Sequence, residues 1–208
     1  MFALLLTYTN RVAEHSADVH SGGWVHCSDF CYWNSPLSEL AGKTFGVYGY
    51  GNIGSRVAKI AEALGMRVVV CTRTPRAEIQ NPVTVQELFA QSDVISLHAP
   101  LTPQTNGMVN KTLLAHAKKN LILINTARGG LVVEHDIRTA LDNGAIAGYA
   151  ADVVVQEPMK TDNPLLGAPR CILTPHLAWA PLETRQRLLD IAAQNLRSFI
   201  TGTPQNAV

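Results

Sequence analysis

Three polar residues with complementary chemistry follow apolar runs in the second half of the chain: Arg128, Glu157 and His176. Because a guanidinium does not lose its proton, Arg128 can anchor an anion, and an imidazole beside a carboxylate can hold a proton near neutral pH. Each also has an ordinary explanation, since a lone histidine after a strand is more often structural and Glu157-Pro158 is a common turn pair. Together they are the groups that acid–base chemistry on an anionic carbonyl compound requires.

A glycine-rich turn lies upstream, in Gly49-Tyr50-Gly51-Asn52-Ile53-Gly54. It directly follows a predicted strand and opens a predicted helix, which is the context of a dinucleotide-binding turn. Gly49 permits the tight turn, Gly51 lets a pyrophosphate approach the backbone, and Gly54 lets helix and strand pack closely. The alternative is an ordinary glycine-rich turn. Beside a nicotinamide, the cation, carboxylate and imidazole would supply what the reduction of a 2-keto acid needs.

The end of the second predicted strand carries no acidic residue. Thr72, Arg73 and Thr74 stand there, followed by Arg76. A carboxylate at this place would bind the ribose 2′-hydroxyl and repel a 2′-phosphate, whereas arginine pairs with phosphate in a fork geometry. We therefore expect NADP(H) to be preferred, with NAD(H) possible. The alternative is that both arginines are solvated surface charges.

The hydrophobic pattern after residue 36 alternates between short strands and helices. Strand, crossover helix and strand in repetition predict an α/β, doubly wound parallel sheet of the Rossmann type, flanked by N- and C-terminal helices. The predicted strands are 44–48, 67–71, 93–97, 121–125, 145–151 and 171–173, and the predicted helices between them are 52–64, 85–91, 111–117 and 134–143.

The two ends of the chain have a different character. Residues 1 to about 20 have helical spacing, and an irregular arm with Trp24, Phe30, Tyr32 and Trp33 follows. These rings either cap the chain's own core or dock on another subunit. The predicted division is a helix and dimerisation arm over 1–35, a dinucleotide-binding domain over 36–180, and a C-terminal helix within 181–208.

Composition excludes several other classes of protein. Hydrophobic residues make up 47% and charged residues 16%, which argues against disorder. With 17 basic and 16 acidic residues and no basic block, nucleic acid is not an expected partner. The apolar start is much shorter than the ~20 residues of a membrane helix, so we expect no membrane association. Four scattered cysteines, expected to be free thiols, suit a cytoplasmic protein and no metal site.

The sequence closely resembles the D-isomer-specific 2-hydroxyacid dehydrogenases, in particular their glycerate dehydrogenase/hydroxypyruvate reductase branch. The matching stretches are residues 49–54, 125–132, 148–158, 163–166, 175–180 and 183–187. The resemblance implies that Arg128 holds the substrate carboxylate and carbonyl oxygen, that His176 is the general acid–base, and that Glu157 is its carboxylate partner. It also implies that Asp152 lies on the nicotinamide side and that Trp179 walls the substrate pocket.

The expected cofactor contacts extend along the whole chain. They are Gly49, Gly51, Asn52, Ile53, Gly54, Thr72, Arg73, Thr74, Pro100, Thr126, Ala127, Arg128, Asp152, His176 and Ala178, and the expected substrate contacts are Arg128, His176 and Trp179. Hydroxypyruvate and glyoxylate are the expected 2-keto acids, and the family resemblance implies a homodimer.

Two departures from the family pattern accompany this resemblance. Val133 replaces a polar residue of many relatives, which we interpret as harmless. Relatives also have a further upstream domain of about one hundred residues that closes over the substrate, and Met1 falls inside what resembles the interdomain helix. We therefore expect cofactor binding with weak or absent turnover, because a missing cleft wall reduces positioning and water exclusion. The alternatives are a dinucleotide-binding scaffold and an inactive dimerising fragment.

Overall fold

The structure, a computed structural model, describes residues 1–74, 76–79 and 82–207. It divides into two compact units, Met1–Thr174 and Pro175–Val208, which we describe separately. The division expected from the sequence, into an arm over 1–35, a dinucleotide-binding domain over 36–180 and a C-terminal helix within 181–208, stays a prediction.

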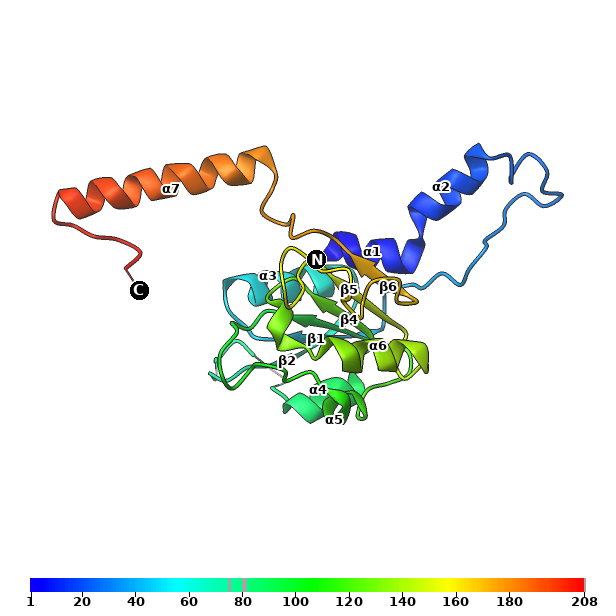
Figure 1. Cartoon of the computed structure of the whole chain (residues 1–208), viewed down its shortest axis with the longest axis horizontal. Coiled ribbons are helices and arrows are strands. Elements are labelled where there is room, and N and C mark those ends of the chain that lie inside the picture. Colours follow the sequence, from blue (N-terminus) through cyan, green and yellow to red (C-terminus); the bar gives the residue numbers. More distant parts are fainter. Residues whose placement is uncertain (75, 80–81, 208) are drawn as a thin grey trace. The chain divides into compact units, whose positions relative to one another are not determined.

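The first unit is built on a parallel sheet of six strands in the order β2-β1-β3-β4-β5-β6 (Figure 1). The strands are β1 (Thr44–Tyr48), β2 (Arg67–Cys71), β3 (Val94–Leu97), β4 (Ile122–Asn125), β5 (Gly148–Ala151) and β6 (Cys171–Leu173). β1 pairs in parallel with β2 on one side and with β3 on the other. The chain therefore adds β2 on one side of β1 and then crosses over to add β3 on the opposite side. Ligands bind at such a switch point, at the carboxyl ends of the strands. The predicted doubly wound α/β fold is confirmed.

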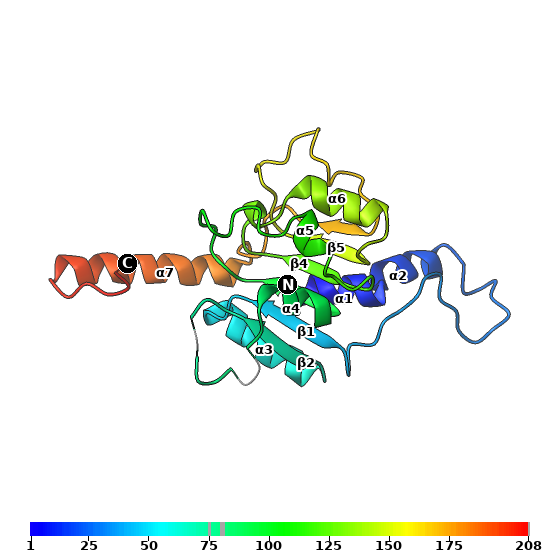
Figure 2. The same ribbon diagram turned by 90° about the horizontal axis from the view of Figure 1, so that it is seen from below.

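Helices cover both faces of the sheet (Figures 1 and 2). On one face lie α1 (Phe2–Asn10) and α3 (Asn52–Ala63), and on the other lie α4 (Val85–Gln91), α5 (Lys111–Leu114) and α6 (Glu134–Asp142). Each face has its own apolar cluster, with Leu5 and Phe45 in one and Phe89 and Leu141 in the other. All residues of β3, β4 and β5 are buried, which explains why these strands lack alternation of apolar and polar residues.

The N-terminal segment is two helices and not the single helix predicted for residues 1 to about 20. Arg11 adopts a left-handed conformation (φ 47°, ψ 38°) between α1 and α2 (Val12–His20), and its N–H closes α1 on Thr7 O at 3.1 Å. The first helix packs on the sheet, where the Tyr8 hydroxyl donates to Ala147 O, whereas α2 contains no buried residue. The helical periodicity of the sequence runs through both helices and so does not reveal the break. The break separates a helix that packs on the sheet from one that does not.

Several other elements are one to three residues shorter than predicted. The strand predicted at 145–151 begins at Gly148, because Ala147 N–H already donates to Leu121 O at 2.9 Å outside the ladder. The helix predicted at 111–117 ends at Leu114. These differences lie at the element ends and leave the order of elements as predicted.

The second unit, Pro175–Val208, consists mainly of α7 (Leu182–Ile200). Several of its large apolar side chains are exposed, among them Leu188, Leu196 and Phe199, and the helix has no buried residue. In the described part of the chain, no helix is both long and apolar enough to span a membrane.

Candidate functional site

The glycine-rich turn connects β1 to α3 and has the geometry that its sequence predicts. Gly49 has a φ of 92°, in the left-handed region, and a Cβ added to it would lie 2.8 Å from the His98 carbonyl carbon. A Cβ on Gly54 would lie 2.0 Å from Gly49 O, so helix and turn tolerate only glycine there. Around Gly51, by contrast, no atom lies within 4 Å of an added Cβ. The open space at Gly51, before an uncapped helix N-terminus, fits a phosphate group.

A cavity of about 510 Å³ lies beside this turn, at the carboxyl ends of β1, β2 and β3. It brings together six of the predicted cofactor residues: Gly49, Gly51, Thr72, Arg73, Thr74 and Pro100. Asn52, Ile53 and Gly54 lie in the first turn of α3 and do not line the cavity. The described residues that line it include Arg73 and Arg76 and no carboxylate. The residues present therefore fit the adenosine and phosphate end of a dinucleotide.

His98 also lines this cavity, and the sequence analysis missed it. It directly follows β3, its N–H donates to Tyr48 O at 2.7 Å, and its buried Nε2 has no hydrogen-bond partner. Burial lowers the pKa of His98 to about 4, so the imidazole is neutral at pH 7. Its position after a strand, where ligands gather in this class of sheet, was the available signal.

The loop after β4 carries Thr126, Ala127 and Arg128. Buried Asn125 fixes this loop: its Nδ2 donates to Arg128 O at 2.9 Å and its Oδ1 accepts from Ala127 N at 3.1 Å. The Arg128 side chain is exposed, with Nη1 donating to Ala127 O at 2.6 Å. Arg128 is thus presented to solvent at the carboxyl edge of the sheet by a loop whose backbone is held by hydrogen bonds.

The loop after β5 carries Asp152 and Glu157. Asp152 is buried, and its Oδ1 accepts from the Thr174 hydroxyl at 2.5 Å. Glu157 is exposed, and its Oε1 accepts from Val154 N at 3.1 Å. The two loops touch closely, since a Cβ on Gly129 would lie 2.0 Å from the Val154 carbonyl carbon.

Glu134 is a second residue that the sequence analysis missed. From the first turn of α6, its Oε1 accepts from Val155 N at 2.8 Å and its Oε2 accepts from Asn163 Nδ2 at 2.9 Å. One carboxylate therefore ties the loop that carries Glu157 to the segment before β6. Its acidic type at a helix start predicts only a favourable helix-dipole interaction, so no sequence signal indicated this role.

His176, Ala178 and Trp179 belong to the second unit. His176 has a φ of 51°, a left-handed conformation that non-glycine residues adopt at a cost of about 1–2 kcal/mol. Trp179 is 54% exposed. The pairing of Glu157 with His176 joins the two units and stays a prediction.

The four cysteines are free thiols, as predicted. Burial raises the pKa of Cys71 and raises that of Cys171 to about 11, so both are protonated at neutral pH. Within the described residues, no group of three or more His, Cys, Asp or Glu side chains is arranged to hold a metal ion.

Comparison with known proteins identifies the family to which the sequence is similar. Residues 2–178 match the family model described as the D-isomer specific 2-hydroxyacid dehydrogenase, NAD binding domain. The chain is 49% identical over 210 residues to a hydroxypyruvate reductase from Blautia hydrogenotrophica, covering 99% of this chain and 65% of that protein. It is 42% identical over 207 residues to a glycerate dehydrogenase from Methylorubrum extorquens, again covering 99% and 65%. The chain thus spans about 65% of the length of these relatives.

Solved structures agree with this assignment. An acyclic imino acid reductase in complex with NADPH and D-Arg superposes with a TM-score of 0.87 at 31% identity, covering 100% of this chain and 65% of that one. A D-lactate dehydrogenase with NAD+ from Lactobacillus jensenii gives a TM-score of 0.83 at 27% identity, covering 100% and 66%. The chain belongs to the D-isomer specific 2-hydroxyacid dehydrogenase family, and its matched residues correspond to the NAD-binding domain of that family.

Proposed function

We propose that this chain binds a nicotinamide dinucleotide and serves the reduction of a small 2-keto acid, hydroxypyruvate or glyoxylate, to the D-2-hydroxy acid. The observation that carries the proposal is the cavity beside the glycine turn, on the same edge of the sheet as the loops of Arg128 and Glu157. The names of relatives, which include hydroxypyruvate reductase, glycerate dehydrogenase and glyoxylate reductase, support this substrate class.

Each residue in the proposed site has a separate task. When bound, the nicotinamide supplies the hydride. Arg128 binds the substrate carboxylate and stabilises the negative charge that develops on the carbonyl oxygen. His176 delivers a proton to that oxygen, and Glu157 favours the protonated imidazole. Asp152 contacts the nicotinamide side, with Ala178 nearby, and Trp179 walls the substrate.

The proposed reaction is tested by NADPH oxidation with hydroxypyruvate and glyoxylate, together with chiral analysis of the product. Because turnover of this chain is expected to be weak or absent, we expect at most slow formation of the D-2-hydroxy acid in the unmodified chain, and loss of any such formation in His176→Ala with dinucleotide affinity retained. Equal rates in the two proteins would contradict the role of His176. Dinucleotide binding without any keto-acid reduction would instead support the scaffold or inactive-fragment alternative.

We further propose that NADP(H) is preferred over NAD(H). Arg73 and Arg76 are exposed and line the cavity with Thr72 and Thr74, and the described lining contains no carboxylate that would repel a 2′-phosphate. Fluorescence titration of NADPH and NADH tests this, and we expect at least about ten-fold tighter binding of NADPH, as for one well-made charged hydrogen-bond pair. Equal affinities would contradict it.

A homodimer is the assembly that we propose. The arm between α2 and β1 exposes Trp24, Phe30 and Trp33 by 53%, 89% and 65%. The Trp24 indole donates to Phe30 O at 3.2 Å, which orders the arm locally while leaving the rings exposed. Aromatic residues are enriched at protein interfaces. Light scattering at micromolar concentration should give a dimer, and a monomer would contradict the proposal.

We also propose a cytoplasmic location, with which the free thiols are compatible.

A further inference from the structure

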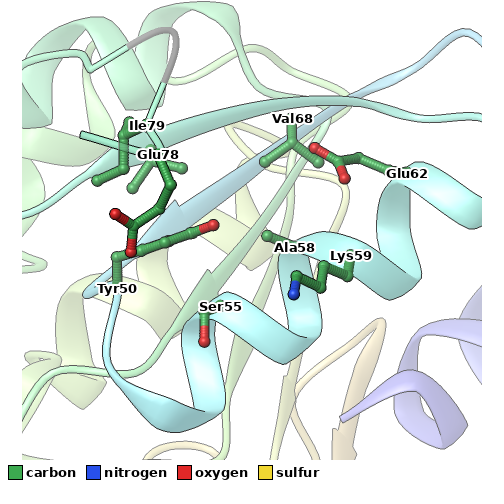
Figure 3. Close-up of a pocket in the computed structure, with 9 residues that line it drawn as sticks. Tyr50, Ser55, Ala58, Lys59, Glu62, Val68, Glu78 and Ile79 are labelled. Atoms are coloured by element: carbon green, nitrogen blue, oxygen red, sulfur yellow. The ribbon is translucent and has the colours of Figure 1, made fainter. Parts of the chain in front are cut away.

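A second hollow (Figure 3) adjoins the cavity at the glycine turn, and Tyr50 lines both. This groove, of about 450 Å³, runs between α3 and the segment that follows β2. Lys59 and Glu62 line it from α3, and Glu78 lines it from the facing segment. The segment with residues 76–79 contributes Arg76 to the cavity and Glu78 to the groove.

One ion pair joins a residue of the cavity to a residue of the groove. Arg76 lines the cofactor cavity, Glu78 lines the groove, and Arg76 Nη1 lies 3.8 Å from Glu78 Oε1. Both side chains are about half exposed, at 48% and 59%. In Figure 3 the Glu78 carboxylate lies beside the Tyr50 ring and away from Lys59 and Glu62 on α3. Arg76 therefore lines the cavity with part of its charge compensated by Glu78.

The two arginines at the cavity differ in this respect. Within the described residues, the structure shows a salt bridge for Arg76 and none for Arg73. To bind a 2′-phosphate in fork geometry, Arg76 must share or give up its contact with Glu78. This competition weakens binding of the phosphorylated cofactor and leaves the unphosphorylated one unaffected.

We propose that Glu78 is a specificity-determining residue, which moderates the preference for NADP(H) over NAD(H) by pairing with Arg76. The inference rests on the proposed binding of the 2′-phosphate by Arg73 and Arg76. Because the pair is half exposed, its strength is that of a surface ion pair, so the expected change in affinity is about three- to five-fold.

The test is a fluorescence titration of NADPH and NADH with Glu78→Gln. We expect NADPH to bind about three- to five-fold more tightly than in the unmodified chain and NADH to bind equally, with the difference reduced in high salt. Glu62→Gln is the matched control, because Glu62 lines the same groove from α3 and has no salt bridge with Arg76. We expect Glu62→Gln to change neither affinity.

A double-mutant cycle with Arg76→Gln tests the route of the effect. In the Arg76→Gln background, Glu78→Gln should leave NADPH affinity unchanged. An equal gain in both backgrounds would overturn the proposal, because Glu78 would then act on the phosphate without Arg76. An unchanged NADPH affinity in the single Glu78→Gln variant would overturn it as well. If the unmodified chain binds NADPH and NADH equally while the cycle shows coupling, the proposed NADP(H) preference fails and the pairing stands.

Discussion

The cavity beside the glycine turn and the set of proposed chemical residues are built differently. The cavity at the ends of β1, β2 and β3 lies within one compact unit, beside a turn whose backbone path requires glycine at Gly49 and Gly54. The proposed chemical residues are side chains from two units, with Arg128 and Glu157 in the first and His176 in the second. The residues that line the cavity therefore all lie within one folded unit, whereas the proposed chemical residues come from both. Substitutions should separate the proposed cofactor binding from the proposed catalysis.

The largest effect on the proposed cofactor binding is expected from Gly54→Ala. The added Cβ would lie 2.0 Å from Gly49 O, so turn and helix must move apart. We expect dinucleotide affinity to fall by about 100-fold or more and the free energy of unfolding to fall by about 2–3 kcal/mol, as for overpacking in a core. Fluorescence titration and urea denaturation measure the two effects.

Gly51→Ala is the matched control for that substitution. No atom lies within 4 Å of its added Cβ and its φ is −89°, so the free energy of unfolding should stay the same. Dinucleotide affinity should still fall, because the methyl group occupies the space proposed for the pyrophosphate. Unchanged affinity in Gly51→Ala would place the cofactor elsewhere.

A pH series sharpens the contrast at His98. Since its pKa is about 4 in the folded chain and near 6.5 in the unfolded chain, the unfolded chain binds more protons between these values. The free energy of unfolding should therefore fall by about 2–3 kcal/mol as the pH drops from about 6.5 to 4. Urea denaturation of His98→Asn should show a smaller fall, and exposed His135→Asn should behave like the unmodified chain. A pH dependence that survives in His98→Asn would contradict the assignment.

The smallest expected effect concerns the tie at Glu134. Both of its partners, Val155 N–H and the Asn163 amide, are donors. In Glu134→Gln, the new side-chain amide NH2 would face one of these two N–H donors and could not accept from it. The substitution should therefore lower the free energy of unfolding by about 1–2 kcal/mol. Adding Asn163→Asp restores an acceptor for the new amide while Leu165 N–H keeps its acceptor, so the double variant should recover the loss. Additive losses would show that the carboxylate does not act through Asn163. NADPH affinity should be unchanged throughout.

Sequence patterns predicted the parts of this molecule that depend on neighbouring residues. The strands, the order of elements and the turn at Gly49 follow from local apolar runs and glycine spacing. Arg11 was not predicted as a helix break, because its left-handed conformation has no glycine or proline signal and accompanies packing of α1 on distant strands. Glu134 was missed for the same reason, because its hydrogen-bond partners Val155 and Asn163 lie far away in the sequence. For His98 the position after β3 was a usable signal, but burial of its Nε2 depends on the tertiary fold.

The packing of α1 has a consequence for synthesis of the chain. Tyr8 bonds to Ala147, 139 residues later, and its ring fills the space in front of Gly148. At about 5–20 residues per second, a ribosome needs roughly 7–28 seconds to make the intervening segment. During that interval the apolar side chains of Phe2, Leu4 and Leu5 lack the strands β4 and β5 that α1 later covers. Helix α1 is thus synthesised well before the strands that complete its packing.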